Sequence, residues 1–185
     1  MGEPVSLTEL IHRAQRRVPA AADSLFATTY PELRKLARAR LRPGGRSTLL
    51  DTTALVHESY LRFAASGRLK LEDRVHFMHW AGRVMRSVIV DFVRRRQADR
   101  RGGAAPNLTL TTQIEGLPSG ENEILRVHEA LDEMAALDPR LAQVVEMRYF
   151  AGMTEAEIAE ALSVTDRTVR RDWEKARLLL REALK

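Results

Sequence analysis

The stretch 153–184 constrains the fold most, because its pattern predicts two helices joined by a tight turn. Thr154 and Glu157 have the spacing of a capping box, which starts a helix. Thr165 is placed to cap a second helix, with Asp166 favourable in its first turn. Apolar residues repeat at helical spacing along each helix, namely Ile158, Ala159 and Leu162, and then Val169, Trp173, Ala176 and Leu180. A short helix, a turn and a longer helix predict a helix-turn-helix, which places its second helix in the major groove of DNA.

The opposite face of that second helix is mostly basic and carries Arg167, Thr168, Arg170, Arg171 and Lys175. Donors gathered on one face suit DNA, since Arg makes bidentate contacts with guanine and both Arg and Lys neutralise phosphates. The alternative interpretation is an ordinary helical hairpin with a solvated charged face. The stretch favours DNA binding but does not by itself decide between the two.

The chain as a whole is basic and contains no cysteine. Its 185 residues carry a formal net charge of +5, with a pI of about 10.1, which suits a polyanionic partner. Without cysteine, neither a disulfide framework nor a thiolate metal site is possible. No apolar run approaches membrane-spanning length and the N-terminus lacks the features of a signal peptide, so we expect a cytoplasmic location. Helical periodicity recurs nearly everywhere and β-branched runs are short, which predicts an all-α fold.

The first half predicts four helices followed by a basic run. Ser6 or Thr8 starts the first, and the helices cover about 8–17, 20–41, 51–66 and 73–97. Pro31 lies inside the second, so we expect a break or kink near residue 30. Asp51, Thr52 or Thr53 caps the third. Five arginines within residues 94–101 exceed what a helix C-terminus needs, which favours a phosphate-contacting surface.

Residues 102–122 interrupt this pattern. They are rich in Gly, Pro, Thr and Asn and have no helical period, which predicts a flexible linker. Helices resume at Glu123, and Pro139 is well placed at the start of a further helix after Asp138. We therefore predict two small helical domains, residues 1–101 and residues 123–185, joined by the linker 102–122.

The two halves together resemble an extracytoplasmic-function (ECF) sigma factor, a small bacterial sigma factor of the sigma-70 class. The C-terminal half is similar to the domain that reads the promoter −35 element, through the run LDEMAALDPRLAQVVEMRYFAGMTEAEIAEALSVTDRTVRRDWEKARLLLREAL. The first half is similar to the domain that binds core polymerase and reads the −10 element, through LVHESYLRF and FMHWAGRVMRSVIVDFVRRR. The resemblance covers about residues 20–185. It implies an alternative sigma factor, which directs core RNA polymerase to promoter DNA, performs no chemistry itself, and uses no cofactor or metal.

The resemblance also implies which residues make the contacts. For the −35 duplex they are Arg167, Thr168, Arg170, Arg171 and Lys175, some of which touch phosphate only and therefore position without specifying. For the melted −10 strand they are Arg83, Arg86, Ser87, Val90 and Arg94, because a captured single strand needs cations along its backbone. For the polymerase clamp they are Asp51, Leu55, Val56 and Glu58.

Three positions near these sites are ambiguous or unusual. Trp80 is placed to stack on a base, but its helical spacing from Phe77 and Val84 favours a core position. Ser87 stands where the family commonly has Asn, which leaves the −10 preference open. Ser163 stands where a helix-turn-helix often has Gly, and a left-handed backbone there costs about 1 kcal/mol.

The segment before the clamp-like helix departs from the family in a way that suggests regulation. Many members carry an acidic run there, whereas this chain has Asp51-Thr52-Thr53-Ala54. A phosphate would restore negative charge and would lie near a helix N-terminus, where anions are favoured. We hypothesise that a Ser/Thr kinase phosphorylates Thr53, or otherwise Thr52, to enable polymerase binding, as in a similar sub-branch of the family with Thr at this point. The simpler explanation is that Thr53 only caps the helix.

Other functions explain less of the sequence. A helix-turn-helix regulator that acts without polymerase accounts for residues 123–185 only. His76 and His79, or His57 with Glu58, suggest a metal or acid–base site, but no motif supplies a third ligand and no catalytic motif is present. A pure protein-interaction module does not require the basic face. An anti-sigma protein is a further candidate partner.

Overall fold

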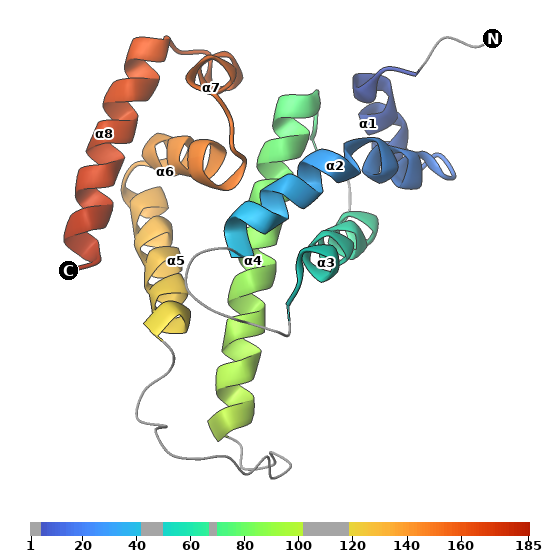
Figure 1. Cartoon of the computed structure of the whole chain (residues 1–185). Helices are drawn as coiled ribbons and strands as arrows, with labels where there is room; N and C mark the ends of the chain where they lie inside the picture. The colour runs from blue at the N-terminus through green and yellow to red at the C-terminus, as the bar shows by residue number, and fades with distance from the viewer. Residues whose placement is uncertain (1–4, 42–49, 67–69, 102–118) are drawn as a thin grey trace.

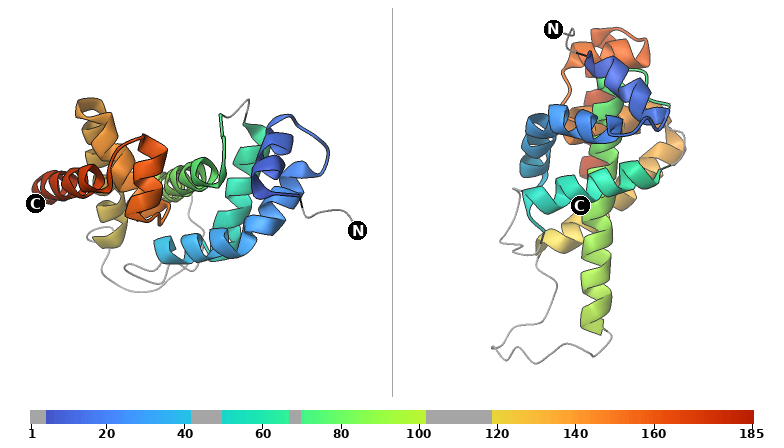
Figure 2. Two further views of the ribbon diagram at one scale, coloured as in Figure 1. Left: turned by 90° about the horizontal axis from the view of Figure 1, so that it is seen from above. Right: turned by 90° about the vertical axis from the view of Figure 1, so that its right-hand side faces the viewer.

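The computed structural model describes residues 5–41, 50–66, 70–101 and 119–185, and every regular element within these ranges is helical (Figure 1). The all-α prediction is therefore confirmed. Helix α4 (Arg74–Arg101) runs through the middle of the molecule, with α1–α3 on one side and α5–α8 on the other, in both the front view and the view from above (Figures 1 and 2).

The first two helices begin as the sequence predicts, but the second is uninterrupted. Helix α1 (Leu7–Gln15) is capped by Ser6, whose side chain accepts a hydrogen bond from the Glu9 backbone N–H. Helix α2 (Ala21–Leu41) runs through Pro31, so of the expected break or kink the break is wrong, while the kink stays a prediction. Leu25 and Leu33 are fully buried on either side of the proline, and this packing offsets the lost backbone hydrogen bond.

Helices α3 (Thr52–Ala65) and α4 complete the first half around an aromatic cluster. Asp51 is the N-cap of α3 and accepts a 2.7 Å hydrogen bond from the Ala54 backbone N–H. The rings of Phe26, Phe63 and Phe77 lie 5.4–6.1 Å apart between centroids, mostly edge to face, which is a favourable geometry for aromatic pairs. This cluster joins α2, α3 and α4 and buries one face of each helix.

The second half contains four α-helices and a short π-helical turn. These are α5 (Ser119–Leu137), α6 (Pro139–Val145), η1 (Glu146–Phe150), α7 (Glu155–Leu162) and α8 (Asp166–Ala183). Helix α5 starts four residues before the predicted Glu123; acidic residues follow Ser119 in the sequence, which suits a helix N-terminus. The rest of the predicted linker, residues 102–118, lies outside the described residues. A small core links α5, α6 and α8 through Leu131, Met134, Leu141, Ala142, Val145, Phe150 and Ala176.

The caps of the last two helices follow the predicted pattern. Thr154 and Glu157 form a capping box at the start of α7, and Thr165 accepts a hydrogen bond from the Thr168 backbone N–H at the start of α8. Ser163 ends α7 with a left-handed backbone, φ 52° and ψ 44°. The strain anticipated at this position is therefore present.

The largest buried cluster extends across both halves of the chain. It contains core residues of α1–α4 together with Val144, Met147, Ile158 and Val169 from the second half. The division into domains at 1–101 and 123–185 stays a prediction. In this conformation the two halves share one core.

Candidate nucleic-acid interface

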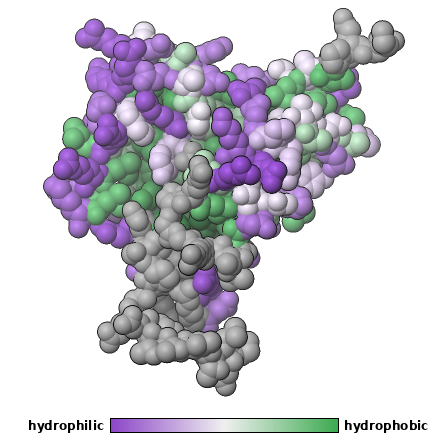
Figure 3. Space-filling view, in the orientation of Figure 1, coloured by the Kyte–Doolittle hydropathy of each residue, from purple (hydrophilic) through white to green (hydrophobic). Residues whose placement is uncertain are grey.

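The basic face of α8 is exposed to solvent near the helix N-terminus. Arg167, Arg170, Arg171 and Lys175 are exposed and Thr168 is half-buried, while Val169 and Ala176 on the opposite side are fully buried. In the space-filling view this end of α8 is mainly hydrophilic (Figure 3). The surface becomes more apolar toward the helix C-terminus, where Leu178 is 66% exposed. The predicted donors thus share one accessible face.

The arginines on that face differ in how far neighbouring acids neutralise them. Arg170 Nε donates a 2.8 Å hydrogen bond to Glu155 of α7, and Arg148 donates another to the same carboxylate. The hydrogen bond from Arg148 and that from Arg170 outweigh partial desolvation and lower the pKa of Glu155, so the bridge is charged at neutral pH. Arg170 therefore holds α7 against α8 through a closer ion pair than that of Arg171, whose Nε lies 3.6 Å from Asp172.

A buried aspartate anchors α8 on α6. Asp172 is only 3% exposed and accepts a 2.7 Å hydrogen bond from Arg140 Nε. Arg171 Nε lies 3.6 Å from the other carboxylate oxygen. Lys175 lies 3.5 Å from Asp138, the N-cap of α6. These contacts fix the rotation of α8, and thus the direction of its basic face.

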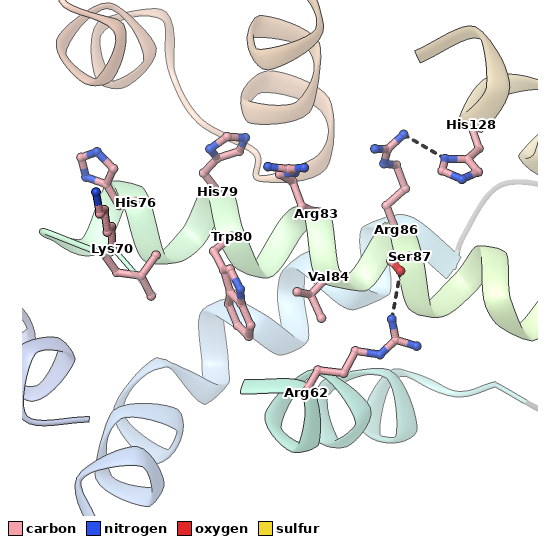
Figure 4. A pocket seen from close by; sticks show the side chains of 11 residues that line it. Arg62, Lys70, His76, His79, Trp80, Arg83, Val84, Arg86, Ser87 and His128 are labelled. Carbon is pink, nitrogen blue, oxygen red and sulfur yellow. Dashed lines mark hydrogen bonds between the residues drawn. The ribbon is translucent and has the colours of Figure 1, made fainter. Parts of the chain in front are cut away.

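A cationic groove of about 610 Å³ lies along α4 (Figure 4). Its lining is rich in basic side chains and comprises Arg62, Lys70, Leu71, His76, His79, Trp80, Arg83, Val84, Arg86, Ser87 and His128. Arg83, Arg86 and Ser87, three of the residues predicted to hold the −10 strand, are thus brought together. Arg94, a fourth, is exposed further along the same helix. Cations beside an aromatic ring are the features by which proteins bind single-stranded nucleic acid.

Trp80 is both a core residue and a wall of the groove. Its ring centroid lies 5.2 Å from that of Phe63 and 6.0 Å from that of Phe77, which agrees with the predicted core position. The side chain is only half-buried and also lines the groove (Figure 4). One ring can therefore pack against the core and still offer an edge to a ligand.

Ser87 belongs to a polar network between α3 and α4. Arg62 donates a 2.9 Å hydrogen bond to the Ser87 hydroxyl and a 2.8 Å bond to Asp91. Arg62 also lies 3.6 Å from Glu58. Arg62 was not predicted as a site residue. Its spacing from Glu58 is visible in the sequence, but its hydrogen-bond partners Ser87 and Asp91 lie on another helix.

Three of the residues predicted to contact a partner are buried in this conformation. Val90 is 2% exposed, Leu55 is fully buried and Val56 is 1% exposed. Leu55 and Val56 lie on the inner face of α3. Both belong to the same buried cluster as the three phenylalanines. None of the three side chains reaches the surface in this conformation. Their helices present other residues outward.

The outer face of α3 carries an apolar side chain that sequence reasoning missed. Leu61 is 57% exposed, on the same helix as exposed His57 and half-buried Glu58. An exposed leucine is ordinary by itself. It becomes a candidate contact residue because it follows Ala54 and His57 at helical spacing. These three exposed residues lie on a different side of α3 from the buried Leu55.

The two candidate threonines lie in the first turn of α3. Thr52 and Thr53 are both half-buried and follow directly after the N-cap. Asp51 alone supplies the capping side chain. Capping therefore does not account for either threonine.

A single buried carboxylate joins three basic side chains of α4. Glu146 of η1 is 8% exposed. It lies 2.8 Å from Arg86, 3.3 Å from Arg83 and 3.4 Å from His79. Burial by itself would raise the pKa of Glu146, but the His79 contact and the charges of Arg83 and Arg86 prevail and lower it. The carboxylate is therefore ionised at neutral pH.

His76 and His128 also have polar partners. His76 Nδ1 lies 2.9 Å from Asp73, the residue that caps α4, and His128 Nδ1 accepts a 3.1 Å hydrogen bond from Arg86. In the part of the chain that the structure describes, no three His, Cys, Asp or Glu side chains are grouped to hold a metal ion. Nor is any helix there both long and apolar enough to span a bilayer.

Comparison with known proteins agrees with this geometry. A Xanthomonas campestris pv. campestris protein named "Probable RNA polymerase sigma factor RfaY" is 26% identical over 133 residues, which cover 70% of this chain. The matched part spans about a third of that relative, 33% of its length. A sequence model of the family described as "ECF sigma factor" matches residues 4–185. Because that match covers nearly the whole chain, the protein belongs to the ECF sigma factor family.

Proposed function

We propose that this chain is an alternative sigma factor, which brings core RNA polymerase to specific promoters. The observation that carries the proposal is the cationic groove on α4, separate from the exposed basic face of α8. One surface suits a melted strand and the other suits duplex DNA. Family membership supports the pairing of the two. The domains are residues 1–101 and 123–185, with the connection between them.

The α4 groove holds the melted −10 strand. Arg83 and Arg86 neutralise backbone phosphates, and Arg94 extends the cationic path along the exposed side of the helix. Trp80 offers the edge of its ring to an unstacked base. Ser87 reads a base edge once Arg62 releases its hydroxyl. Val90 is buried in the core and does not contact the strand.

The α8 face reads the −35 duplex. Arg167 and Arg171 enter the major groove, where Arg pairs with guanine, and Thr168 and Lys175 contact base edges or phosphate beside them. Arg170 contributes mainly by holding α7 on α8 through Glu155. A fixed helix pair lets the exposed side chains meet base edges at a defined angle.

The outer face of α3 docks on the polymerase clamp. Asp51 and Glu58 offer carboxylates to a basic surface, and Leu61 supplies the apolar contact that is buried on binding. Leu55 and Val56 support this face from the core side. The contact residues therefore differ in part from those that the family resemblance implied.

Phosphorylation of Thr53, or otherwise of Thr52, activates this docking face. Each threonine lies in the first turn of α3, where the helix dipole favours a phosphate. A phosphate adds about −1.5 to −2 charges at neutral pH, which replaces the acids that other members carry before this helix. Asp51 already caps α3, so a threonine there needs another explanation. The chain then belongs to the branch of the family that a Ser/Thr kinase controls.

Thr8 provides a matched control for this proposal. It is exposed and is the second residue of α1, as Thr53 is the second residue of α3. We expect Thr53→Asp to bind core polymerase more tightly than the unmodified chain, and Thr53→Ala to bind no better after treatment with a kinase. Thr8→Asp should change nothing. Equal core affinity for all these variants in a fluorescence titration contradicts the phosphorylation proposal and leaves the sigma-factor proposal intact.

Transcription with purified core polymerase tests the function itself. Core alone and core with the protein are compared on genomic fragments from the source organism, and transcript 5′ ends are mapped. The proposal predicts new starts that require the protein and share upstream sequence elements. DNA binding without core-dependent initiation would instead identify a helix-turn-helix regulator. An anti-sigma partner, if one exists, would suppress these starts when added.

A further inference from the structure

The contact between α4 and the second half is closely fitted. Gly82 of α4 is buried, and a Cβ at this position would lie 2.9 Å from the backbone carbon and oxygen of Phe150. Real side chains essentially never approach backbone so closely. Only glycine lets the η1 backbone lie directly on α4. The two halves therefore meet at a shaped interface with no room for a side chain.

Ion pairs surround this close approach. Arg86 contacts the second half through Glu146 at 2.8 Å, His128 at 3.1 Å and Asp132 at 3.5 Å. Its guanidinium also lies 5.7 Å from the centroid of the Phe150 ring. At the N-terminal end of α4, Arg74 pairs with Glu157 of α7 at 3.1 Å. The contacts run along one side of α4, from its first turn to Arg86.

The same arginines are those that the proposed function assigns to the −10 strand. Arg86 is only 12% exposed at its side chain, and its hydrogen-bond donors already meet a carboxylate and an imidazole. Figure 4 shows Arg83, Arg86 and His79 pointing away from α3, toward the segments of the second half, with the dashed bond from Arg86 to His128. In this conformation a carboxylate contacts the donors that the proposed function assigns to a backbone phosphate.

We propose that the free chain is held in a closed, autoinhibited state, in which Glu146 of the second half occupies Arg83 and Arg86 in place of the promoter strand. The inference rests on the proposed function, because it concerns the same groove. Opening separates η1 from α4 and frees both arginines for DNA. Polymerase docking, which holds the two halves at separated promoter elements, selects the open state.

Two substitutions release the closed state in different ways. Glu146→Gln keeps the size of the side chain and removes its charge. Gly82→Ala keeps α4 helical, since Ala is a better helix former than Gly, but its methyl group collides with the Phe150 backbone. Glu133→Gln is the control: Glu133 is an exposed acid on α5, so it changes the net charge equally without touching α4. Circular dichroism confirms that each variant is folded.

Binding and distance are measured on the full chain without polymerase. The probe is a fluorescein-labelled, mixed-sequence single strand of about 20 nucleotides, longer than the site of a typical single-strand groove. The α8 face is the same in all variants, so differences in affinity report on α4. The chain has no cysteine, and dyes at Ala64→Cys and Glu174→Cys, both exposed positions on α3 and α8, report the distance between the halves by energy transfer.

We expect Glu146→Gln and Gly82→Ala to bind the strand about tenfold more tightly, within the usual range of coupling between sites, and to show lower energy transfer. Glu133→Gln should match the unsubstituted chain in both. Unchanged affinity and energy transfer in both variants overturn the closed state. Tighter binding at unchanged energy transfer also overturns it, because charge alone then explains the gain. Core-dependent initiation by the unsubstituted chain separately tests the proposed function.

Discussion

The left-handed backbone of Ser163 allows a quantitative prediction. Its φ of 52° and ψ of 44° cost a residue with a Cβ about 1–2 kcal/mol, whereas glycine adopts these angles without a steric penalty. Glycine also gives the unfolded chain more freedom, which costs about 0.4–1 kcal/mol. The difference predicts that Ser163→Gly raises the free energy of unfolding by about 0.5–1 kcal/mol.

Backbone hydrogen bonds near Ser163 should survive this change. The backbone N–H groups of Ser163 and Val164 donate to the carbonyls of Glu160 and Ala159, and neither bond involves the serine side chain. For a chain of this length the gain corresponds to a rise in melting temperature of about 1–4 °C, measured by circular dichroism with urea unfolding alongside.

Ser163→Ala is the matched control, because it removes the hydroxyl and keeps the strained backbone. We expect no gain from it. Ala20 has a similar φ of 59°, so Ala20→Gly should stabilise the chain to a comparable degree. A Ser163→Gly chain that melts at or below the temperature of the unsubstituted protein would refute the strain argument.

Three further predictions concern the proposed surfaces. Leu61→Asp should lower core-polymerase affinity by about tenfold or more without changing the melting temperature, whereas Val18→Asp, at another exposed apolar residue, should leave that affinity unchanged. Arg171→Ala should reduce the slope of log affinity against log salt concentration for duplex binding by about one. Arg170→Ala should reduce this slope less, because Glu155 already neutralises Arg170. Equal reductions by the two variants would contradict this. Burial, with a further contribution from the Arg86 and Arg94 charges, lowers the pKa of His128 from its ordinary 6.5 against the opposing pull of Asp132 and Glu129. The imidazole of His128 therefore binds a proton more readily in the unfolded chain than in the folded chain. The free energy of unfolding should fall as pH drops through 6.5 and level off below the pKa of His128 in the folded chain. Urea unfolding at about pH 7.5 and about pH 5.5 measures this, and the same loss in a His128→Asn chain would show that other groups cause it.

Local structure could be predicted closely from the sequence. Ser6, Asp51 and Thr165 cap their helices where side-chain oxygens precede an apolar repeat, since capping depends on residues three positions apart. Thr154 and Glu157 form the predicted capping box for the same reason. Of the break or kink expected near Pro31, the break did not occur, because burial on both sides of the proline prevails over the local penalty.

Contacts between distant parts of the chain could not be predicted in this way. Arg86 and Glu146 are sixty residues apart, and no local pattern indicates that they meet. The same holds for Gly82, whose role depends on the Phe150 backbone. Leu55 and Val56 fit the family motif, but a motif does not say which side of a helix faces a partner and which faces the core. Burial decides that question only once the helices are packed.

Promoter melting tests the central claim most directly. The claim is that α4 holds an open strand while α8 holds duplex DNA. On a promoter recovered from the transcription experiment, core polymerase with the protein should make thymines near −10 reactive to permanganate and should protect the −35 region from nuclease. A chain with Arg83→Ala and Arg86→Ala should lose the permanganate reactivity and keep the −35 protection. Full melting by that double variant, or protection lost together with melting, would contradict the assignment of the two helices.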